Sequence, residues 1–140
     1  MKYRTPAAMC FALLILCSTT SVRAHHSFAS EFDASRPVLL RGKITRVEWI
    51  NPHTWVHIEV EIEDGTHEAW MVEGGTPNTM LRAGFTRDTL AAGTEIVVRG
   101  YRSRDPNCIP ACRANGRDIT FPDGSKVFMA SPGSSRPDDE

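Results

Sequence analysis

The sequence has 140 residues, which is enough for one domain, and 41% of them are hydrophobic, 24% charged and 8% aromatic. This composition excludes collagen-like, coiled-coil and wholly disordered proteins. The formal net charge is -1, which provides no electrostatic basis for binding DNA or RNA. We therefore expect one folded domain that does not bind nucleic acid.

Residues 1–24 have the three parts of a secretory signal peptide. Lys2 and Arg4 make the start positive, residues 7–17 are apolar, and the segment ends in small side chains. The apolar run is about 11 residues long, whereas a transmembrane helix needs about 20, which disfavours an uncleaved membrane anchor. We therefore predict cleavage before His25, export to the bacterial periplasm, and no membrane insertion of the mature chain.

Cleavage would change both the charge and the cysteine content. The leader holds three of the 16 basic side chains, so the mature chain would carry 13 basic and 17 acidic side chains, a net charge of -4. Of the four cysteines, Cys108 and Cys112 would remain. In an oxidising periplasm we expect them to form a disulfide, and the small loop that it closes means little entropic stabilisation.

The mature chain is predicted to begin with an N-terminal arm over residues 25–37, which is polar and without periodicity. Residues 38–50 follow as the first strand. Their alternation of apolar and polar side chains changes phase near Thr45 and Arg46, which predicts a β-bulge. Pro52 ends the strand because proline lacks a backbone donor for the sheet.

The clearest strand covers residues 53–63, where apolar and polar side chains alternate. Residues 67–72 form its partner. A three-residue loop over residues 63–65, with Gly65 left-handed, aligns the apolar faces of the two strands, whereas a two-residue loop would not. The predicted cross-strand pairs are Val56 with Val72, Ile58 with Trp70, Val60 with Glu68, Ile62 with Thr66, His57 with Met71 and Glu61 with His67.

A short helix is predicted next, with Thr76 as its N-cap, Pro77 in its first turn and Gly84 as its end. The remaining expected elements are strands over 95–101, 117–121 and 126–129, a loop over 103–116 that contains both cysteines, and a disordered polar tail over 131–140. Five to six strands with one helix between the third and fourth predict a mainly β domain over residues 38–130, a small OB-like β-barrel. A seven-stranded sandwich is the alternative.

A series of short motifs follows in order along the mature chain: His25-His26-Ser27-Phe28, Glu48-Trp49-Ile50-Asn51-Pro52-His53, Glu73-Gly74-Gly75-Thr76-Pro77-Asn78, Gly84-Phe85-Thr86-Arg87-Asp88 and Pro122-Asp123-Gly124. In these motifs the chain resembles a family of small secreted proteobacterial proteins of unknown function. The resemblance implies an exported bacterial domain and the barrel fold. It brings no established activity, cofactor or catalytic residue.

Histidines at the predicted mature start suggest copper. Cleavage before His25 would place its amino group and imidazole together, a pair that chelates Cu(II), and His26 would add another nitrogen. On the predicted hairpin, His57 lies opposite Met71, a nitrogen–thioether pair that suits Cu(I). His53 lies roughly 13 Å from His57 along the strand, too far to share one ion. We therefore expect a site that joins the arm to His57 or His53, with copper as the single predicted cofactor.

A tryptophan on the outward face of the hairpin suggests a partner surface instead. Trp55 points outward, and Trp49 could join it across the bulge. Exposed tryptophans are typical of binding surfaces, here for an unidentified periplasmic protein or small ligand. Alternatively, Phe28 or Phe32 of the arm covers Trp55, and Met71 packs beside it. The two functions that we predict are thus a copper-binding module and an accessory binding domain without metal.

Enzymatic function is not predicted. The chain has no phosphate-binding glycine loop, nucleophile elbow or paired-histidine helix motif. Glu59, Glu61 and Glu63 alternate on a solvated face, which offers no pocket for a general acid. Cys108 and Cys112 follow no helix start that would activate a thiol, and zinc would need two further ligands that the sequence does not place nearby. We therefore predict no catalytic residues and a structural disulfide.

Overall fold

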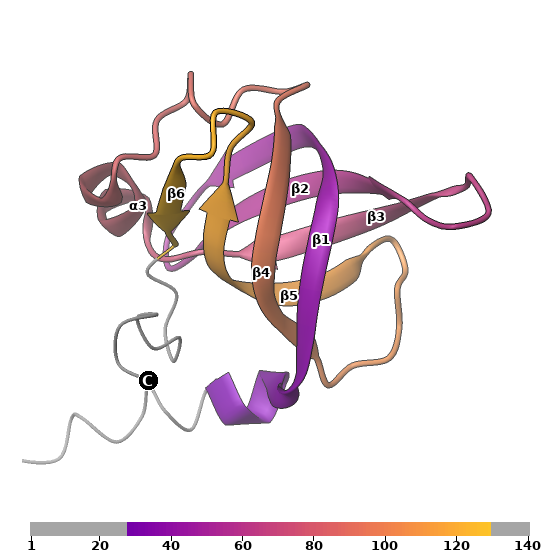
Figure 1. Cartoon of the computed structure of the whole chain (residues 1–140). Helices are drawn as coiled ribbons and strands as arrows, with labels where there is room; N and C mark the ends of the chain where they lie inside the picture. The colour runs from indigo at the N-terminus through magenta and orange to yellow at the C-terminus, as the bar shows by residue number, and fades with distance from the viewer. Residues whose placement is uncertain (1–27, 130–140) are drawn as a thin grey trace, which may run out of the picture.

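The computed structural model describes residues 28–129 and shows a mainly β protein (Figure 1). Its elements in chain order are β1 (Phe32–Trp49), β2 (Thr54–Glu61), β3 (His67–Glu73), α3 (Pro77–Ala83), β4 (Glu95–Ser103), β5 (Cys112–Thr120) and β6 (Lys126–Phe128). A helical turn over residues 28–31 precedes β1. The mainly β class and the helix between the third and fourth strands are as predicted. The predicted signal peptide and the tail over 131–140 lie outside the described residues.

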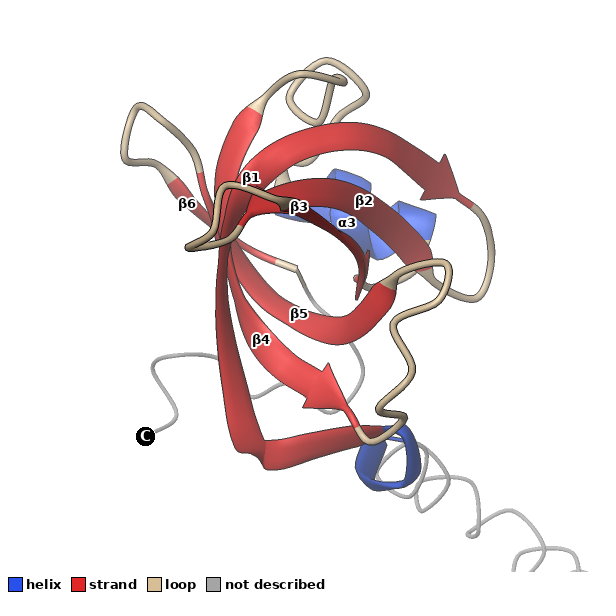
Figure 2. Cartoon of the chain, turned by 90° about the vertical axis from the view of Figure 1, so that its right-hand side faces the viewer, coloured by secondary structure: helices blue, strands red, loops and turns tan. Residues whose placement is uncertain are grey.

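The strand pairings run through the sheet in the order β3-β2-β1-β4-β5-β6, and a further parallel pairing of β3 with β5 closes the first five strands into a ring. Strand β1 pairs with β4 through residues 32–43 and with β2 through residues 42–49, and it curves around the ring (Figure 2). Gly42 pairs with β2 and with β4, and a Cβ atom at this position would collide with the carbonyl group of Glu59. The close approach of the two strands therefore requires glycine there.

The β2–β3 hairpin has the predicted register. Gly65 has φ 79°, and the amide of Ile62 bonds to the carbonyl of Thr66, as a three-residue loop requires. The observed pairs are Val56 with Val72, Ile58 with Trp70, Val60 with Glu68, His57 with Met71 and Glu61 with His67. The predicted bulge is also present, because the pairing of β1 with β2 shifts between Ile44 and Arg46.

The caps of α3 also confirm their predictions. The side chain of Thr76 accepts a hydrogen bond from the amide of Thr79, and Gly84 ends the helix in the left-handed conformation with φ 105°. No helix among residues 28–129 is both long enough and apolar enough to cross a membrane.

Two predicted strand starts are wrong by five residues or more. Strand β1 begins at Phe32 rather than at residue 38, so part of the predicted arm over residues 25–37 is strand; Phe32 pairs with Ser103 and is 2% exposed. Strand β5 begins at Cys112 rather than at residue 117, so the predicted loop over 103–116 is shorter. Both extensions come from pairings with distant strands, which local periodicity does not show.

One hydrophobic core fills the ring, with contributions from the first five strands, from α3 and the segment that follows it, and from the residue after β6. Its members are Leu40, Ile44, Val56, Ile58, Trp70, Val72, Met80, Phe85, Leu90, Ile96, Val98, Cys112, Ala114, Ile119 and Met129. Because successive strand residues point to opposite faces, the neighbours of these core residues on β2, β3 and β5 point outward. We call the outward residues of β2, β3 and the start of β5 the hairpin face.

Candidate functional site

The hairpin face carries most of the described residues that the sequence predicts to be functional. Trp55 on β2 lies opposite Glu73 on β3, and His57 lies opposite Met71. The parallel pairing with β5 extends this face by placing Arg113 beside Met71. The face therefore combines imidazole, carboxylate, thioether and guanidinium groups with an aromatic ring.

A histidine and a buried glutamate meet at one end of the hairpin face. The Nδ1 atom of His53, just before β2, lies 3.6 Å from Oε1 of Glu73, which is only 5% exposed. Burial raises the pKa of Glu73, while the neighbouring side chains of His53, Arg113 and Asn115 act in the opposite direction. A carboxylate that is this buried is stable only with such polar partners around it.

The turn over residues 28–31 packs against the same end of the hairpin face. Oε2 of Glu31 lies 3.7 Å from Nη2 of Arg113, whose guanidinium stands 5.0 Å from the centre of the Trp55 ring. The negative charge of Glu31 also contributes to the raised pKa of Glu73. Figure 2 shows this turn at the end of β4, next to the loop that leads into β5. The start of the described chain is thus tied through Arg113 to the Trp55 side of the hairpin face.

Aromatic contacts fix the position of this turn. The ring of Phe28 lies 5.8 Å from that of Phe32 and 5.8 Å, edge-on, from that of Tyr101. Tyr101 pairs with Asn115, which is also the β5 partner of Glu73. Among the described residues, the group that stacks on the Trp55 ring is the guanidinium of Arg113, not the ring of either phenylalanine. The predicted cover by Phe28 or Phe32 is therefore replaced by an arginine that the turn holds through Glu31.

His57 lies in a separate environment from His53. Its side chain is 9% exposed, and its Nε2 atom lies 3.1 Å from Oε1 of Glu48, which also contacts Arg46. Burial lowers the pKa of His57, Arg46 lowers it further, and Glu48 opposes both. Met71, opposite His57, is half-buried. The structure therefore gives His53 and His57 different carboxylate partners, as their expected separation along the strand implies.

The two predicted surface tryptophans do not share a face. Trp49 pairs with Thr54, a fully buried residue, and packs against the core, while Trp55 points outward. The bulge in β1 causes this, because it shifts the alternation so that the side chains of Val47 and Trp49 turn toward the core. Both rings are half-buried rather than exposed, and Arg87 stands 5.9 Å from the centre of the Trp49 ring.

A third cluster surrounds the cysteine pair. Cys108 and Cys112 are at disulfide-bonding distance, as predicted. Oε1 of Glu68 on β3 lies 3.3 Å from the sulfur of Cys112, and ligand atoms of these three residues lie within 4.8 Å of one another. This is the one cluster of at least three potential metal ligands among residues 28–129. Sequence reasoning missed Glu68 because its contact depends on the long-range pairing of β3 with β5.

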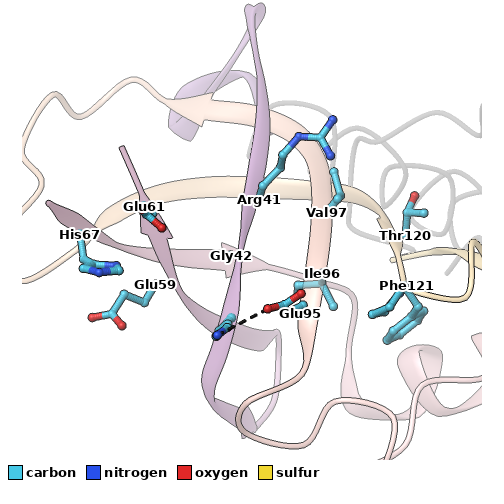
Figure 3. A pocket seen from close by; sticks show the side chains of 12 residues that line it. Arg41, Gly42, Glu59, Glu61, His67, Glu95, Ile96, Val97, Thr120 and Phe121 are labelled. Atoms are coloured by element: carbon cyan, nitrogen blue, oxygen red, sulfur yellow. Dashed lines mark ion pairs between the residues drawn. The ribbon is translucent and has the colours of Figure 1, made fainter. Parts of the chain in front are cut away.

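The far end of the hairpin, at its turn, borders an open cleft of about 460 Å³ (Figure 3). The lining includes the ionisable residues Arg41, Lys43, Glu59, Glu61, His67 and Glu95. Lys43 and Glu95 form an ion pair at 3.4 Å in which both side chains are about two-thirds exposed. Such solvated charges contribute little binding energy. The ionisable residues that line this cleft are all exposed, whereas Glu73 at the His53 end is buried.

The chain belongs to the family described as a family of unknown function (DUF6152), whose model matches residues 12–110. The matched range includes the two predicted mature N-terminal histidines, His53 and Glu73, and it ends before Cys112. A comparison with curated proteins finds no match. Function must therefore be argued from the chemistry of the site.

Proposed function

We propose that the protein is an exported, non-enzymatic copper-binding module of the periplasm, built on an OB-like β-barrel. The strand order, the parallel pairing of β3 with β5 and the helix between β3 and β4 support the barrel. A fold does not determine a function. The argument for copper therefore depends on the side chains at the His53 end of the hairpin face.

The observation that carries the proposal is the position of His53 and Glu73 at the end where the 28–31 turn packs. His25 and His26 lie outside the described residues, but they precede Phe28 by only three and two residues. Their Cα atoms are therefore within about 11 Å and 7 Å of the Cα atom of Phe28. The proposed site requires that this short connection bring the predicted N-terminal histidines to His53.

The proposed ligands are the amino group and imidazole of His25, the imidazole of His26 and the imidazole of His53. Amine and imidazole nitrogens are ligands that suit Cu(II). Because Nδ1 of His53 faces Glu73, its Nε2 atom is the nitrogen that remains for the metal. A carboxylate on the second nitrogen of a ligating histidine orients the ring and strengthens it as a ligand. Glu73 would play this part.

His57 is a weaker candidate than His53. Its Nε2 atom is engaged by Glu48, and its side chain is nearly buried. A metal would have to displace that carboxylate before it could use His57 together with Met71. Of the two arrangements predicted from the sequence, we therefore propose the one through His53.

Calorimetric titration with Cu(II) tests the role of the terminal amine. The two proteins to compare are a chain that begins at His25 and the same chain with one glycine added before His25. We expect the added residue to weaken Cu(II) binding at least about tenfold, or 1.4 kcal/mol. Equal affinities of the two chains, with unchanged circular dichroism spectra, would contradict the proposal.

Export is tested separately by mass spectrometry of the protein recovered from a periplasmic extract. We expect a mature chain that starts at His25, produced by cleavage after Ala24. A chain that retains residues 1–24 in the cytoplasmic fraction would contradict export.

The alternative function is an accessory domain that binds a protein or small ligand through the hairpin face without metal. The half-buried stack of Arg113 on Trp55 favours it, because tryptophan and arginine are the residues most enriched at the energetic centres of interfaces. The titration separates the two functions. Absence of Cu(II) binding by the chain that begins at His25 would support the accessory domain and exclude the copper module.

A further inference from the structure

The cysteine pair lies where β3, β5 and the loop between β4 and β5 meet, and Glu68 lies next to it. Cys112 is the first residue of β5 and pairs with Trp70 on β3, and Cys108 lies in the loop between β4 and β5. Between the cysteines, Ile109 is 91% exposed, while Cys112 is 1% exposed. Cys108 is half-buried. One sulfur therefore belongs to a solvent-facing loop and the other to the core.

Glu68 is held with one oxygen directed at this pair. The indole N–H of Trp70 donates a 2.6 Å hydrogen bond to Oε2 of Glu68. The other oxygen, Oε1, is the one that lies 3.3 Å from the sulfur of Cys112. A hydrogen bond to the second atom of a ligand group is how proteins orient metal ligands. The orientation of Glu68 is thus already the one that a metal ligand would need.

Arg102 supplies a positive charge beside both sulfurs. Its Nη2 atom lies 3.4 Å from the sulfur of Cys108 and 3.7 Å from that of Cys112. Its guanidinium also stands 4.9 Å from the centre of the Trp70 ring, which fixes its position. A neighbouring cation stabilises a thiolate relative to a thiol. Arg102 would therefore balance part of the negative charge that two thiolates and Glu68 bring together once the disulfide is opened.

We propose that the Cys108–Cys112 disulfide is reducible and that the reduced pair, with Glu68, binds a thiophilic divalent cation of the zinc type. This inference is independent of the copper proposal, because it uses other residues. Two thiolates and one carboxylate are ligands found in zinc sites, with a water molecule completing the tetrahedron. The three negative ligands and a divalent cation sum to one negative charge, which Arg102 offsets.

The opening of the disulfide requires a dithiol as reductant. One thiolate of the dithiol attacks the sulfur of Cys108, the S–S bond breaks, and Cys112 leaves as a thiolate beside Arg102. The second thiol of the dithiol then attacks the mixed disulfide and releases the Cys108 thiolate. The dithiol is oxidised to a disulfide, and its two protons go to the cysteine thiolates or to solvent. Binding of the cation releases whatever protons the two thiols hold.

The test is a Co²⁺ titration of the mature chain, followed in the near-ultraviolet and visible. One sample is oxidised; the other is reduced with dithiothreitol and desalted under argon. We expect thiolate-to-cobalt charge-transfer absorption in the reduced protein alone, and its loss when Zn²⁺ displaces Co²⁺. Histidine-bound cobalt gives no such band, so a site at the predicted copper ligands cannot produce it. Absence of the band in the reduced protein would overturn the proposal.

Two glutamate variants define the ligand set. Glu68→Gln is expected to weaken Co²⁺ binding by about 10- to 100-fold. Glu59→Gln, at an exposed side chain on the neighbouring strand β2, is the matched control and should bind Co²⁺ like the unchanged protein. Equal Co²⁺ affinities of Glu68→Gln and Glu59→Gln would contradict the role of Glu68.

Alkylation provides a control that does not depend on a folded cysteine variant. The unchanged chain is reduced, treated with iodoacetamide to block both sulfurs, and its circular dichroism compared with that of the reduced protein. We expect alkylation to abolish the charge-transfer band while the spectrum keeps its β-sheet form. Persistence of the band after both cysteines are alkylated would show that the sulfurs are not the ligands.

Discussion

The two ends of the β2–β3 hairpin have similar residue types but opposite environments. At the end where β2 begins, Glu73 is 5% exposed and lies beside His53. At the turn end, Glu59 and His67 border an open cleft and are exposed (Figure 3). The strand alternation is the same at both ends. The difference arises from what packs over each end, and only the first has the 28–31 turn and β5 beside it.

The largest effect is expected from loosening the start of β1, which holds the 28–31 turn through the contact of Phe32 with Phe28. Phe32→Ala removes a buried ring at the start of β1, and such a deletion costs about 3–5 kcal/mol of unfolding free energy. Leu39→Ala, at a side chain on the same strand that is 57% exposed, is the control and should change it by less than about 0.5 kcal/mol. Urea denaturation measures both. Similar losses in the two variants would show that the start of β1 does not support this end.

A smaller effect is expected from the charge that bridges the turn and the hairpin face. Arg113→Ala would remove the contacts of Arg113 with Glu31 and with the Trp55 ring, and it should lower the unfolding free energy by about 1–2 kcal/mol. Lys43→Ala at the turn end breaks an exposed pair and should cost less than about 1 kcal/mol. Urea denaturation of both variants tests the comparison. Equal decreases in unfolding free energy would show that the contacts at the two ends contribute equally to stability.

The smallest effect is a pH dependence at His57, between the two ends. Burial lowers the pKa of this imidazole in the folded state, so below the ordinary value of about 6.5 the unfolded chain binds a proton that the folded chain does not. Stability is therefore retained above pH 6.5 and lost as the pH falls toward the lowered pKa. Arg46 and Glu48 are the charged groups that face the ring.

The corresponding measurement is the urea midpoint at pH 7.5 and at pH 5.5. In the unchanged protein we expect a lower midpoint at pH 5.5, and in His57→Gln a smaller decrease, because glutamine does not titrate. Identical decreases in the two proteins would assign the pH dependence to other groups.

Much of the fold could be predicted because local patterns determine it. Alternation with a left-handed Gly65 fixes the hairpin register, and Thr76 with Gly84 fixes the ends of α3. The starts of β1 and β5 could not be predicted, because pairings with distant strands extend them. Residues such as Ala114 and Asn115 have no strong strand preference of their own.

The residue types of the candidate site could be predicted from the sequence, but not which side chains contact one another. Alternation correctly places His57 opposite Met71, yet it cannot show that the carboxylate of Glu48 contacts the Nε2 atom of His57. It also cannot show that Glu73 is buried beside His53, because that burial comes from β5 and the 28–31 turn. In the sequence, Glu73 is marked only as the first residue of the motif that continues to Asn78.

The central claim, that His53 rather than a turn-end histidine completes a copper site with the N-terminal histidines, is tested most directly by a competitive Cu(II) titration. The three proteins all begin at His25: the unchanged chain, His53→Ala and His67→Ala. We predict that His53→Ala binds Cu(II) at least about tenfold more weakly, while His67→Ala stays within about twofold of the unchanged chain. Binding by His53→Ala that is as tight as that of the unchanged chain would contradict the claim.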